Sequence, residues 1–263
     1  MGDFRLVLLQ TRYGLKLLTR NPRVIVFTIA FPVVLLVLFN AIFSSGDNAT
    51  TELAGTSIST DAYFTAGIIA YAIMMSSFST LAIGLTTQRE SGVLKRLRGT
   101  PLPSWTFIAA QLLRSILLVA AMVIVLLLIG HFAFDVPIPG SRMVGFVIYV
   151  ALGTATLAAL GVALTVVTPT AEAASTIAPF GTVMLSFISG VFIPVETLPD
   201  WLEEVGRIFP LAHLAEGLQT TLGVSGGGTG LSGDNVAVLA VWGLAGLVVA
   251  ARRFRWEPQA ARG

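Results

Sequence analysis

The chain has 263 residues, of which 55% are hydrophobic and 11% are charged, and its formal net charge is +2. Because soluble domains carry about 25% charged residues, this composition excludes an ordinary water-soluble protein and indicates that lipid solvates most of the chain. The sequence contains no cysteine, which excludes a disulfide framework, an iron–sulfur site and a thiol nucleophile.

The first 23 residues predict an amphipathic helix that lies on the cytoplasmic face of the membrane. On a helix, the five basic residues of this segment fall within one arc of about 80°, and Phe4, Leu8, Leu15 and Leu18 lie beyond one side of it. The cations would then lie near anionic lipid headgroups. The alternative is a cytoplasmic extension of the first membrane span with a solvated basic face.

Six apolar stretches are long enough to cross a bilayer, since a membrane helix needs about 20 predominantly apolar residues. They are Val24–Phe43, Ala62–Leu85, Thr106–Gly130, Met143–Val167, Ser175–Pro194 and Asn235–Ala251. The first exceeds the apolar core of a signal peptide, and no A-x-A-like site follows it, so we expect it to remain as a span. The prediction is an all-α integral membrane protein with an interfacial helix over 1–23, a six-span domain over 24–251 and a basic tail over 252–263.

Basic residues are concentrated in alternate connecting segments. Of the 16, 13 lie before the first span, between the second and third spans, or after the sixth. This asymmetry predicts a multi-pass protein with both termini in the cytoplasm, in agreement with an even number of spans. Arg114 lies about two turns inside the third span from the cytoplasmic side, where its long side chain can reach the membrane surface.

Several chemistries have no suitable residues. The two lysines, Lys16 and Lys95, do not follow the glycines of a phosphate-binding Gly-x4-Gly-Lys-Ser/Thr loop, so we do not expect this chain to hydrolyse ATP. His131 and His213 are far apart in sequence, and without cysteine they predict no zinc or other metal site. No carboxylate lies in the central part of a predicted span, which argues against coupling to an ion gradient.

The segment between the second and third spans, Thr86–Trp105, predicts a short amphipathic helix that ends at Gly99, before Pro101. One helical face would carry Glu90, Val93, Leu94 and Leu97, and basic residues would lie on both sides of it. Leucines surrounded by cations are suited to docking in a groove of another protein. The alternative is an ordinary basic cytoplasmic loop.

This segment resembles the signature R-E-x-G-x-L-x-R-L-x-x-T-P that follows the second span in type-2 ABC transporter permeases. The matching positions are Arg89, Glu90, Gly92, Leu94, Arg96, Leu97, Thr100 and Pro101. In that family, the region contacts the nucleotide-binding subunit as a coupling helix. The same resemblance implies a second, smaller contact at the next cytoplasmic loop, Thr168–Ala174, whose charged residue is Glu172.

The stretch from Ser189 to Leu218 resembles the same family's connection between the fifth and sixth spans, where short helices re-enter the outer leaflet. Prolines divide the stretch, and aromatic residues suit a membrane interface. The residues that carry the likeness are Gly190, Phe192, Pro194, Pro199, Trp201 and Pro210. A surface amphipathic helix with no special role is the alternative.

The resemblance implies the membrane subunit of an ABC exporter, close to bacterial drug-exporter permeases of the daunorubicin-resistance type and therefore located in the cytoplasmic membrane. Its partners would be a separate ATPase, which holds ATP and Mg²⁺, a second permease copy or homologue, and membrane lipids, but no nucleic acid. The substrate would be hydrophobic or amphiphilic, such as a drug, lipid or glycolipid. A secondary transporter, a channel or a membrane scaffold with no ATPase partner is the alternative.

Two further patterns have open interpretations. Methionine and aromatic side chains in the second and fifth spans suit an adaptable apolar substrate path, although such residues also pack helices or face lipid: Met74, Met75, Phe78, Phe180, Met184 and Phe187. The fourth span has alanines at helical spacing from Ala151 to Ala163, flanked by Gly153 and Gly161. These small residues predict close packing, either within the subunit or at a dimer interface.

Overall fold

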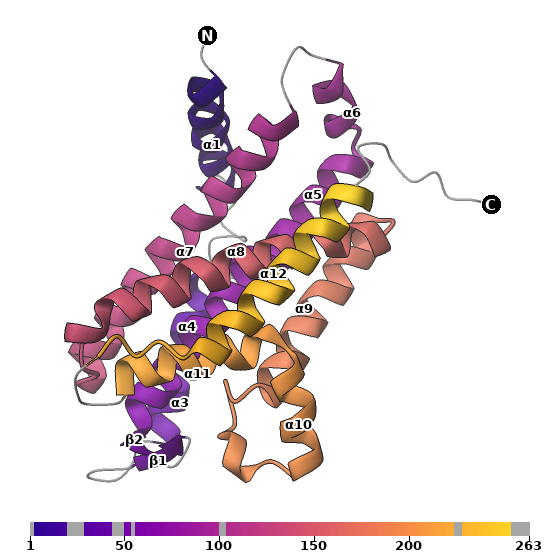
Figure 1. Ribbon diagram of the computed structural model, residues 1–263. Coiled ribbons are helices and arrows are strands. Elements are labelled where there is room, and N and C mark those ends of the chain that lie inside the picture. Colours follow the sequence, from indigo (N-terminus) through magenta and orange to yellow (C-terminus); the bar gives the residue numbers. More distant parts are fainter. Residues whose placement is uncertain are drawn as a thin grey trace.

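The computed structural model describes residues 3–19, 29–43, 50–53, 56–99, 104–223 and 228–253, and they are mostly helical. In chain order the elements are α1 (Asp3–Thr19), α3 (Phe31–Phe43), β1 (Thr50–Leu53), β2 (Thr56–Ser59), α4 (Thr60–Met74), η2 (Met75–Ser79), α5 (Thr80–Glu90), α6 (Val93–Arg98), α7 (Ser104–Phe134), η3 (Gly140–Arg142), α8 (Met143–Val167), α9 (Ala171–Ile188), η4 (Val195–Thr197), α10 (Asp200–Ile208), α11 (Pro210–Gly223) and α12 (Gly233–Arg253). Figure 1 shows the long helices side by side in one bundle.

Five helical segments of the described chain are long and apolar enough to cross a membrane: Thr60–Glu90, Ala109–Phe134, Gly140–Val167, Ala171–Ile188 and Gly233–Arg253. They correspond to the second through sixth predicted spans. For the first, α3 is an apolar helix of 13 residues, which extends about 20 Å at a rise of 1.5 Å per residue. The start of that predicted span, up to residue 28, lies outside the described residues.

The helix ends differ from several predicted span boundaries, most at the ends of the second and fifth spans. The second span does not end at Leu85, because α4, η2 and α5 form one helical run to Glu90. The fifth span ends at Ile188 and not at Pro194. After Ile188 the chain turns, and Gly190 takes a left-handed conformation with φ of 71°, which glycine adopts without steric cost.

The core of the bundle surrounds α4. Of the most apolar 18-residue stretch of the α4–α5 run, 72% of the residues are buried. The corresponding value is 22% for α9 and for α12, so the α4–α5 run is the central span. Large buried side chains of α4, among them Ile68, Tyr71 and Met74, pack against α3, α7, α8 and α11. The outer helices expose their apolar residues, as expected for a bundle in lipid.

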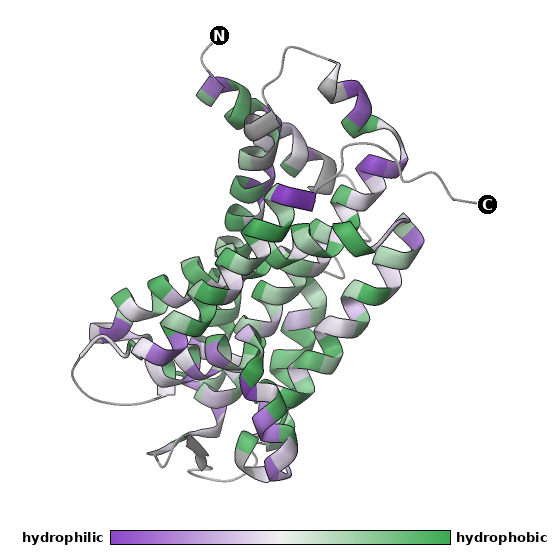
Figure 2. Cartoon of the chain, turned by 45° about the vertical axis from the view of Figure 1, so that its right-hand side comes forward, coloured by the Kyte–Doolittle hydropathy of each residue, from purple (hydrophilic) through white to green (hydrophobic). Residues whose placement is uncertain are grey.

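Hydropathy divides the bundle along its length. Figure 2 shows hydrophobic residues concentrated in the middle and hydrophilic residues toward both ends. One end holds the start of α1, α6 and the end of α12, and we call it the α6 end (Figure 1). The opposite end, called the α10 end, holds α10 and the antiparallel hairpin of β1 and β2, in which Thr50 pairs with Ser59. The hairpin is a small addition to the predicted all-helical fold.

The N-terminal helix packs along α7. Its buried residues Val7 and Thr11 face that helix, and the Thr11 hydroxyl lies 3.4 Å from the carbonyl oxygen of Ala110. One turn further along, Gly14 lies against Arg114, so the two helices run parallel. The predicted apolar side is exposed at Phe4 and Leu8. Placement of α1 on a membrane surface stays a prediction.

Small residues of α8 permit close contacts inside the subunit. Gly161 lies against the backbone of Ser77 and Phe78 in η2, and Gly153 lies against Leu214 of α11. Ala151 and Ala155 are exposed. The buried glycines therefore serve internal packing, the first of the two interpretations given above.

Gly161→Ala is expected to lower the thermal unfolding midpoint of the purified protein. A Cβ at this position would lie 2.7 Å from the carbonyl oxygen of Phe78, so η2 and α8 would have to separate. Overpacking of this kind costs about 1–3 kcal/mol. The matched control is Gly181→Ala in α9, where the added Cβ meets nothing within 4 Å. The control should keep or raise the midpoint, and equal midpoints for the two variants would contradict the contact.

Candidate functional site

A buried arginine joins the end of α5 to the end of α8. The Arg89 side chain is 1% exposed. Its Nη1 donates to the carbonyl oxygen of Thr165 at 2.7 Å, and its Nη2 donates to that of Thr168 at 2.5 Å and to that of Pro169 at 3.2 Å. The last carbonyls of a helix lack partners within the helix and carry the negative end of its dipole. Arg89 therefore caps α8 from a neighbouring helix.

The next residue binds the start of α9. Glu90 Oε2 accepts a hydrogen bond of 2.7 Å from the backbone N–H of Ala171, the first residue of that helix. The same turn is capped locally, because the Thr170 hydroxyl accepts from the N–H of Ala173 at 3.2 Å. A carboxylate is favourable at a helix N-terminus, where N–H groups are unpaired. Arg89 and Glu90 thus hold both sides of the connection 168–170, and we call this arrangement the Arg89–Glu90 clamp.

After the clamp the chain turns at Gly92, whose φ of 71° favours glycine. Helix α6 begins at Val93 and ends where the N–H of Gly99 bonds to the carbonyls of Lys95 and Arg96 at 3.3 and 3.1 Å. The predicted short helix and its stop at Gly99 are therefore confirmed. Glu90, however, does not share a face with the α6 residues as predicted, because the turn at Gly92 separates α5 from α6.

The leucine expected to enter a groove of another protein points into this chain instead. Leu94 is 0% exposed and packs with Leu81, Leu85, Phe107 and Ala158. It fixes α6 to the bundle, so the prediction of an outward-facing Leu94 is wrong. Helical periodicity identifies an apolar face but does not tell whether the partner of that face is in the same chain.

The exposed part of α6 has a different composition. Val93 is 38% exposed, and Lys95 and Arg96 are exposed beside it. Glu172 is exposed in the first turn of α9, close in sequence to the residues that the clamp holds. The side chain of Leu97 and both Thr100 and Pro101 lie outside the described residues. The described surface at this site is therefore one apolar side chain among charges of both signs.

Helices α5 and α9 are also joined at the start of α5, away from the clamp. Ser79, the last residue of η2, makes a buried hydroxyl–hydroxyl hydrogen bond of 2.6 Å with Thr182 of α9. Helices α5 and α9 are thus tied at both ends of α5. Single π-helical turns such as η2 occur frequently at functional sites, and this one lies where α5 meets α4.

At the opposite end, the chain returns toward the middle of the bundle after α9. The indole Nε1 of Trp242 donates to the carbonyl oxygen of Ile208 at 2.8 Å, and the Trp242 ring stacks on Phe209. Trp242 is the tenth of the 21 residues of α12, so the junction between α10 and α11 lies level with the middle of that helix. Helix α11 then runs back along α8, with Leu214 against Gly153 and Gly217 against Tyr149.

The six residues that carry the family likeness in the segment after α9 lie at different positions in the structure. The carbonyl of Gly190 accepts from the hydroxyl of Tyr63 at 2.7 Å and from the amide of Gln219 at 3.0 Å, and Phe192 is buried. Pro194, Pro199 and Pro210 precede or begin η4, α10 and α11. Trp201 is 66% exposed at the start of α10. The prolines thus divide the segment into short helices, as predicted.

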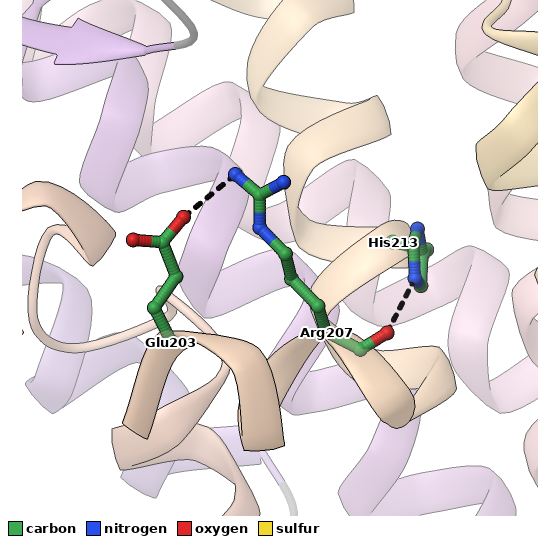
Figure 3. A network of polar contacts seen from close by, with 3 residues as sticks. All are labelled: Glu203, Arg207 and His213. Carbon is green, nitrogen blue, oxygen red and sulfur yellow. Dashed lines mark hydrogen bonds and ion pairs between the residues drawn. The ribbon is translucent and has the colours of Figure 1, made fainter. Parts of the chain in front are cut away.

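His213 joins three helices at this end (Figure 3). Its Nε2 lies 2.8 Å from the carbonyl oxygen of Arg207, whose side chain pairs with Glu203 at 2.7 Å. Its Nδ1 lies 2.7 Å from Oδ1 of Asn235 in α12. In the part of the chain that the structure describes, no group of three His, Asp or Glu residues could hold a metal ion. Through these contacts His213 connects α11 with α10 and α12.

The six predicted substrate-path residues do not come together. Met74 and Phe78 line an apolar cavity of about 310 Å³ with Leu157, Leu185 and Trp242. Met75 packs against the core, while the other three lie exposed on the outer face of α9: Phe180, Met184 and Phe187. Sequence reasoning missed Leu157 and Trp242, since nothing local marks which helices of a bundle become neighbours.

Comparison with known proteins gives consistent matches. The model of the ABC-2 type transporter family matches residues 5–222, from α1 into α11. The chain is 22% identical over 203 residues to "Putative transport permease YvfS" of Bacillus subtilis (strain 168), which covers 77% of this chain and 80% of that relative. It is 26% identical over 136 residues to "Probable multidrug ABC transporter permease YbhR" of Escherichia coli (strain K12), a match of 51% of this chain and 36% of the relative's length.

Arg89→Met is expected to destabilise the protein and to loosen the connection between α8 and α9. Methionine keeps an unbranched apolar stem but leaves the carbonyls of Thr165 and Thr168 without their donor. Leaving such buried groups unpaired costs about 1–3 kcal/mol. Thermal unfolding and amide hydrogen exchange at 168–171 measure the effect. The control is Arg96→Met on the exposed side of α6. Equal exchange rates in the two variants would show that Arg89 does not hold the connection.

Proposed function

The chain belongs to the ABC-2 type transporter family, and from that premise we propose that it is the permease subunit of an ABC exporter. In this proposal it moves a hydrophobic or amphiphilic substrate outward, and a separate subunit binds and hydrolyses the ATP. Its being a membrane transport permease follows from the family match and from the relatives named as permeases. The direction, the substrate and the partners belong to the proposal.

The observation that carries the proposal is the Arg89–Glu90 clamp next to α6. A partner that pushes on α6 acts on α5 across a single turn at Gly92 and, through the clamp, on α8 and α9. Leu94 anchors α6 in the bundle, so a push on α6 is transmitted and not absorbed by a loose loop. This arrangement suits a part that receives force from another subunit.

The proposed movement is a switch between two packed states. Helices α5 and α9 move as one body because the clamp and the Ser79–Thr182 hydrogen bond join them. The π-helical turn η2 is the proposed hinge between this body and the buried α4. Packed helices of this kind shift as rigid units between discrete arrangements and do not deform continuously. The shift would open and close the path for the substrate.

The proposed topology has six spans, with both termini and the α6 end in the cytoplasm. Basic residues favour this orientation, because Lys95 and Arg96 lie on α6 and Arg252 and Arg253 end α12. In the same orientation, α10 and α11 form a re-entrant pair from the outer surface. Its support is the junction at Ile208 and Phe209, level with the middle of α12. The backbone there lies against protein, as a buried non-spanning segment requires.

The proposed substrate class rests on the cavity beside η2. Its lining is almost entirely apolar and includes Met74, Phe78 and Trp242, side chains that adapt to varied greasy ligands. Its position beside the proposed hinge allows its shape to change with the switch. The exposed Phe180, Met184 and Phe187 face of α9 lies outside this cavity, and we assign it to lipid or to a second permease copy.

Val93→Asp is expected to weaken binding of the partner ATPase by at least about tenfold. The change in ATP turnover that this binding causes should fall by a similar factor. The reason is that a buried unpaired charge at an interface costs several kcal/mol. Val93 is exposed on α6, so this substitution alters the docking surface without opening the core. The measurement is co-purification with the ATPase, followed by ATP hydrolysis in lipid vesicles. The control is Leu231→Asp at the other end of the bundle, where the leucine is 37% exposed against 38% for Val93.

Glu90→Ala tests the clamp in the same assay and should retain ATPase binding while weakening the coupled change in turnover. If no ATPase binds the wild type, the exporter proposal fails, and a carrier, channel or scaffold becomes the better account. Equal behaviour of Val93→Asp and Leu231→Asp would move the docking surface away from α6.

A further inference from the structure

A groove at the α6 end has no assigned role in the proposed transport cycle, although Val93 in its lining also belongs to the proposed docking surface. It has a volume of about 600 Å³ and lies between α1, α7 and the corner where α5 meets α6. Lys16 and Arg114 provide positive charge, and none of the described residues in the lining is acidic. Hydrogen-bonding side chains complete the polar part: Gln10, Tyr13, Gln88 and Gln111. This composition is suited to an anion with several oxygen acceptors.

Arg114 is built into the groove by the packing of α1 on α7. Its Cδ and Nη1 would lie 3.1 and 3.2 Å from a Cβ on Gly14, so the absence of a side chain there leaves room for the guanidinium. The neighbouring Thr11 hydroxyl lies near the carbonyl of Ala110 and keeps the two helices together. The helix pair therefore places this cation in the lining of the groove.

The depth of Arg114 makes a counter-charge favourable. It is the sixth residue of the candidate span Ala109–Phe134, about 8 Å along the helix from its start. Within the described ranges, its guanidinium makes no hydrogen bond or ion pair with a protein group. A charge at such a depth is costly unless an anion or water accompanies it. Because the groove is open to the surface of the bundle, a phosphate at the membrane interface can reach it.

An apolar stripe on α7 continues from Arg114 toward the other end of the bundle. Leu117, Ile124 and Leu128 are 43%, 57% and 48% exposed, and Ala121 lies exposed among them. At 100° per residue these four positions lie within about 80° of Arg114 around the helix. A ligand with its phosphate on Arg114 would therefore have a hydrocarbon-binding surface directly below it. That combination distinguishes a lipid from a soluble anion.

We infer that the groove binds the headgroup of an anionic phospholipid from the cytoplasmic leaflet. The phosphate pairs with Arg114 and Lys16, the glutamines bond the remaining headgroup oxygens, and one acyl chain lies on the stripe below. The orientation rests on the proposed topology, but the binding itself needs no ATPase. Gln88 precedes the clamp and Val93 begins α6. The bound headgroup therefore contacts the segment that transmits force.

Native mass spectrometry of the full-length protein tests this site directly. Phosphatidylglycerol and phosphatidylcholine with identical acyl chains are titrated onto the wild type, Arg114→Gln, Arg114→Lys and Lys16→Gln. The control variant is Arg5→Gln, which removes an exposed α1 cation that does not line the groove. Glycerol 3-phosphate serves as the soluble anion. Thermal unfolding shows that each variant remains folded.

The expected result is a preference for phosphatidylglycerol that falls about fivefold in Arg114→Gln and in Lys16→Gln, since each cation near a headgroup contributes about that factor. Arg114→Lys and Arg5→Gln should keep most of the preference. Equal binding of the two lipids, or an equal loss in Arg5→Gln and Arg114→Gln, would overturn the site. Binding of glycerol 3-phosphate as tight as that of phosphatidylglycerol would overturn the lipid as its occupant. Because no ATPase is present, these outcomes are independent of the exporter proposal.

Discussion

The contact on which the arrangement of the α6 end depends is the pairing of Arg89 with the last carbonyls of α8. A buried guanidinium is unfavourable unless acceptors replace its water, and three backbone carbonyls do so here. The carbonyls of Thr165 and Thr168 lie at the end of α8, where they have no partner within the helix, and the two Nη atoms supply their donors. The Nε of Arg89 is buried without a partner among the described residues. With Glu90 on the N-terminus of α9, two adjacent residues determine where α5, α8 and α9 meet. The position of α6 follows from this junction and from the burial of Leu94.

The clamp connects the surface at α6 with the centre of the bundle. Through α5 and α9 it leads to η2, where Ser79 meets Thr182 and Gly161 permits close contact with α8. The apolar cavity lined by Met74 and Phe78 lies at the same level. In the proposed cycle, a displacement at the clamp would therefore reach the cavity through helices and direct contacts, without a long flexible connection.

Sequence reasoning predicts the parts of this structure that depend on local pattern. The apolar runs predict five of the spans, Gly99 ends α6 as expected, and the prolines divide the α10–α11 segment. The Arg–Glu–Gly signature locates the clamp, but it gives no indication that Arg89 is buried or which carbonyls it binds. These features depend on α8 and α9, which lie more than 70 positions away along the chain.

The errors have physical causes of the same kind. Leu94 was placed on an outward face because an amphipathic helix shows only that an apolar face exists and not what covers it. The face shared by Glu90 and α6 assumed a continuous helix, whereas Gly92 adopts a positive φ and breaks it. The groove beside α1 could not be predicted, because it depends on α1 running parallel to α7. No periodicity in either segment indicates that packing.

We propose that the clamp makes α5 and α9 move as one body when ATP binds to the partner. Because the chain has no cysteine, spin labels can be attached to introduced cysteines without background. Thr87 and Thr176 are exposed on α5 and α9, and Leu231 is exposed at the α10 end. Electron–electron resonance in the complex with the ATPase should show a Thr87–Thr176 distance that is unchanged by ATP, while the Thr87–Leu231 distance changes. A Thr87–Thr176 distance that changes as much as the other would contradict the account.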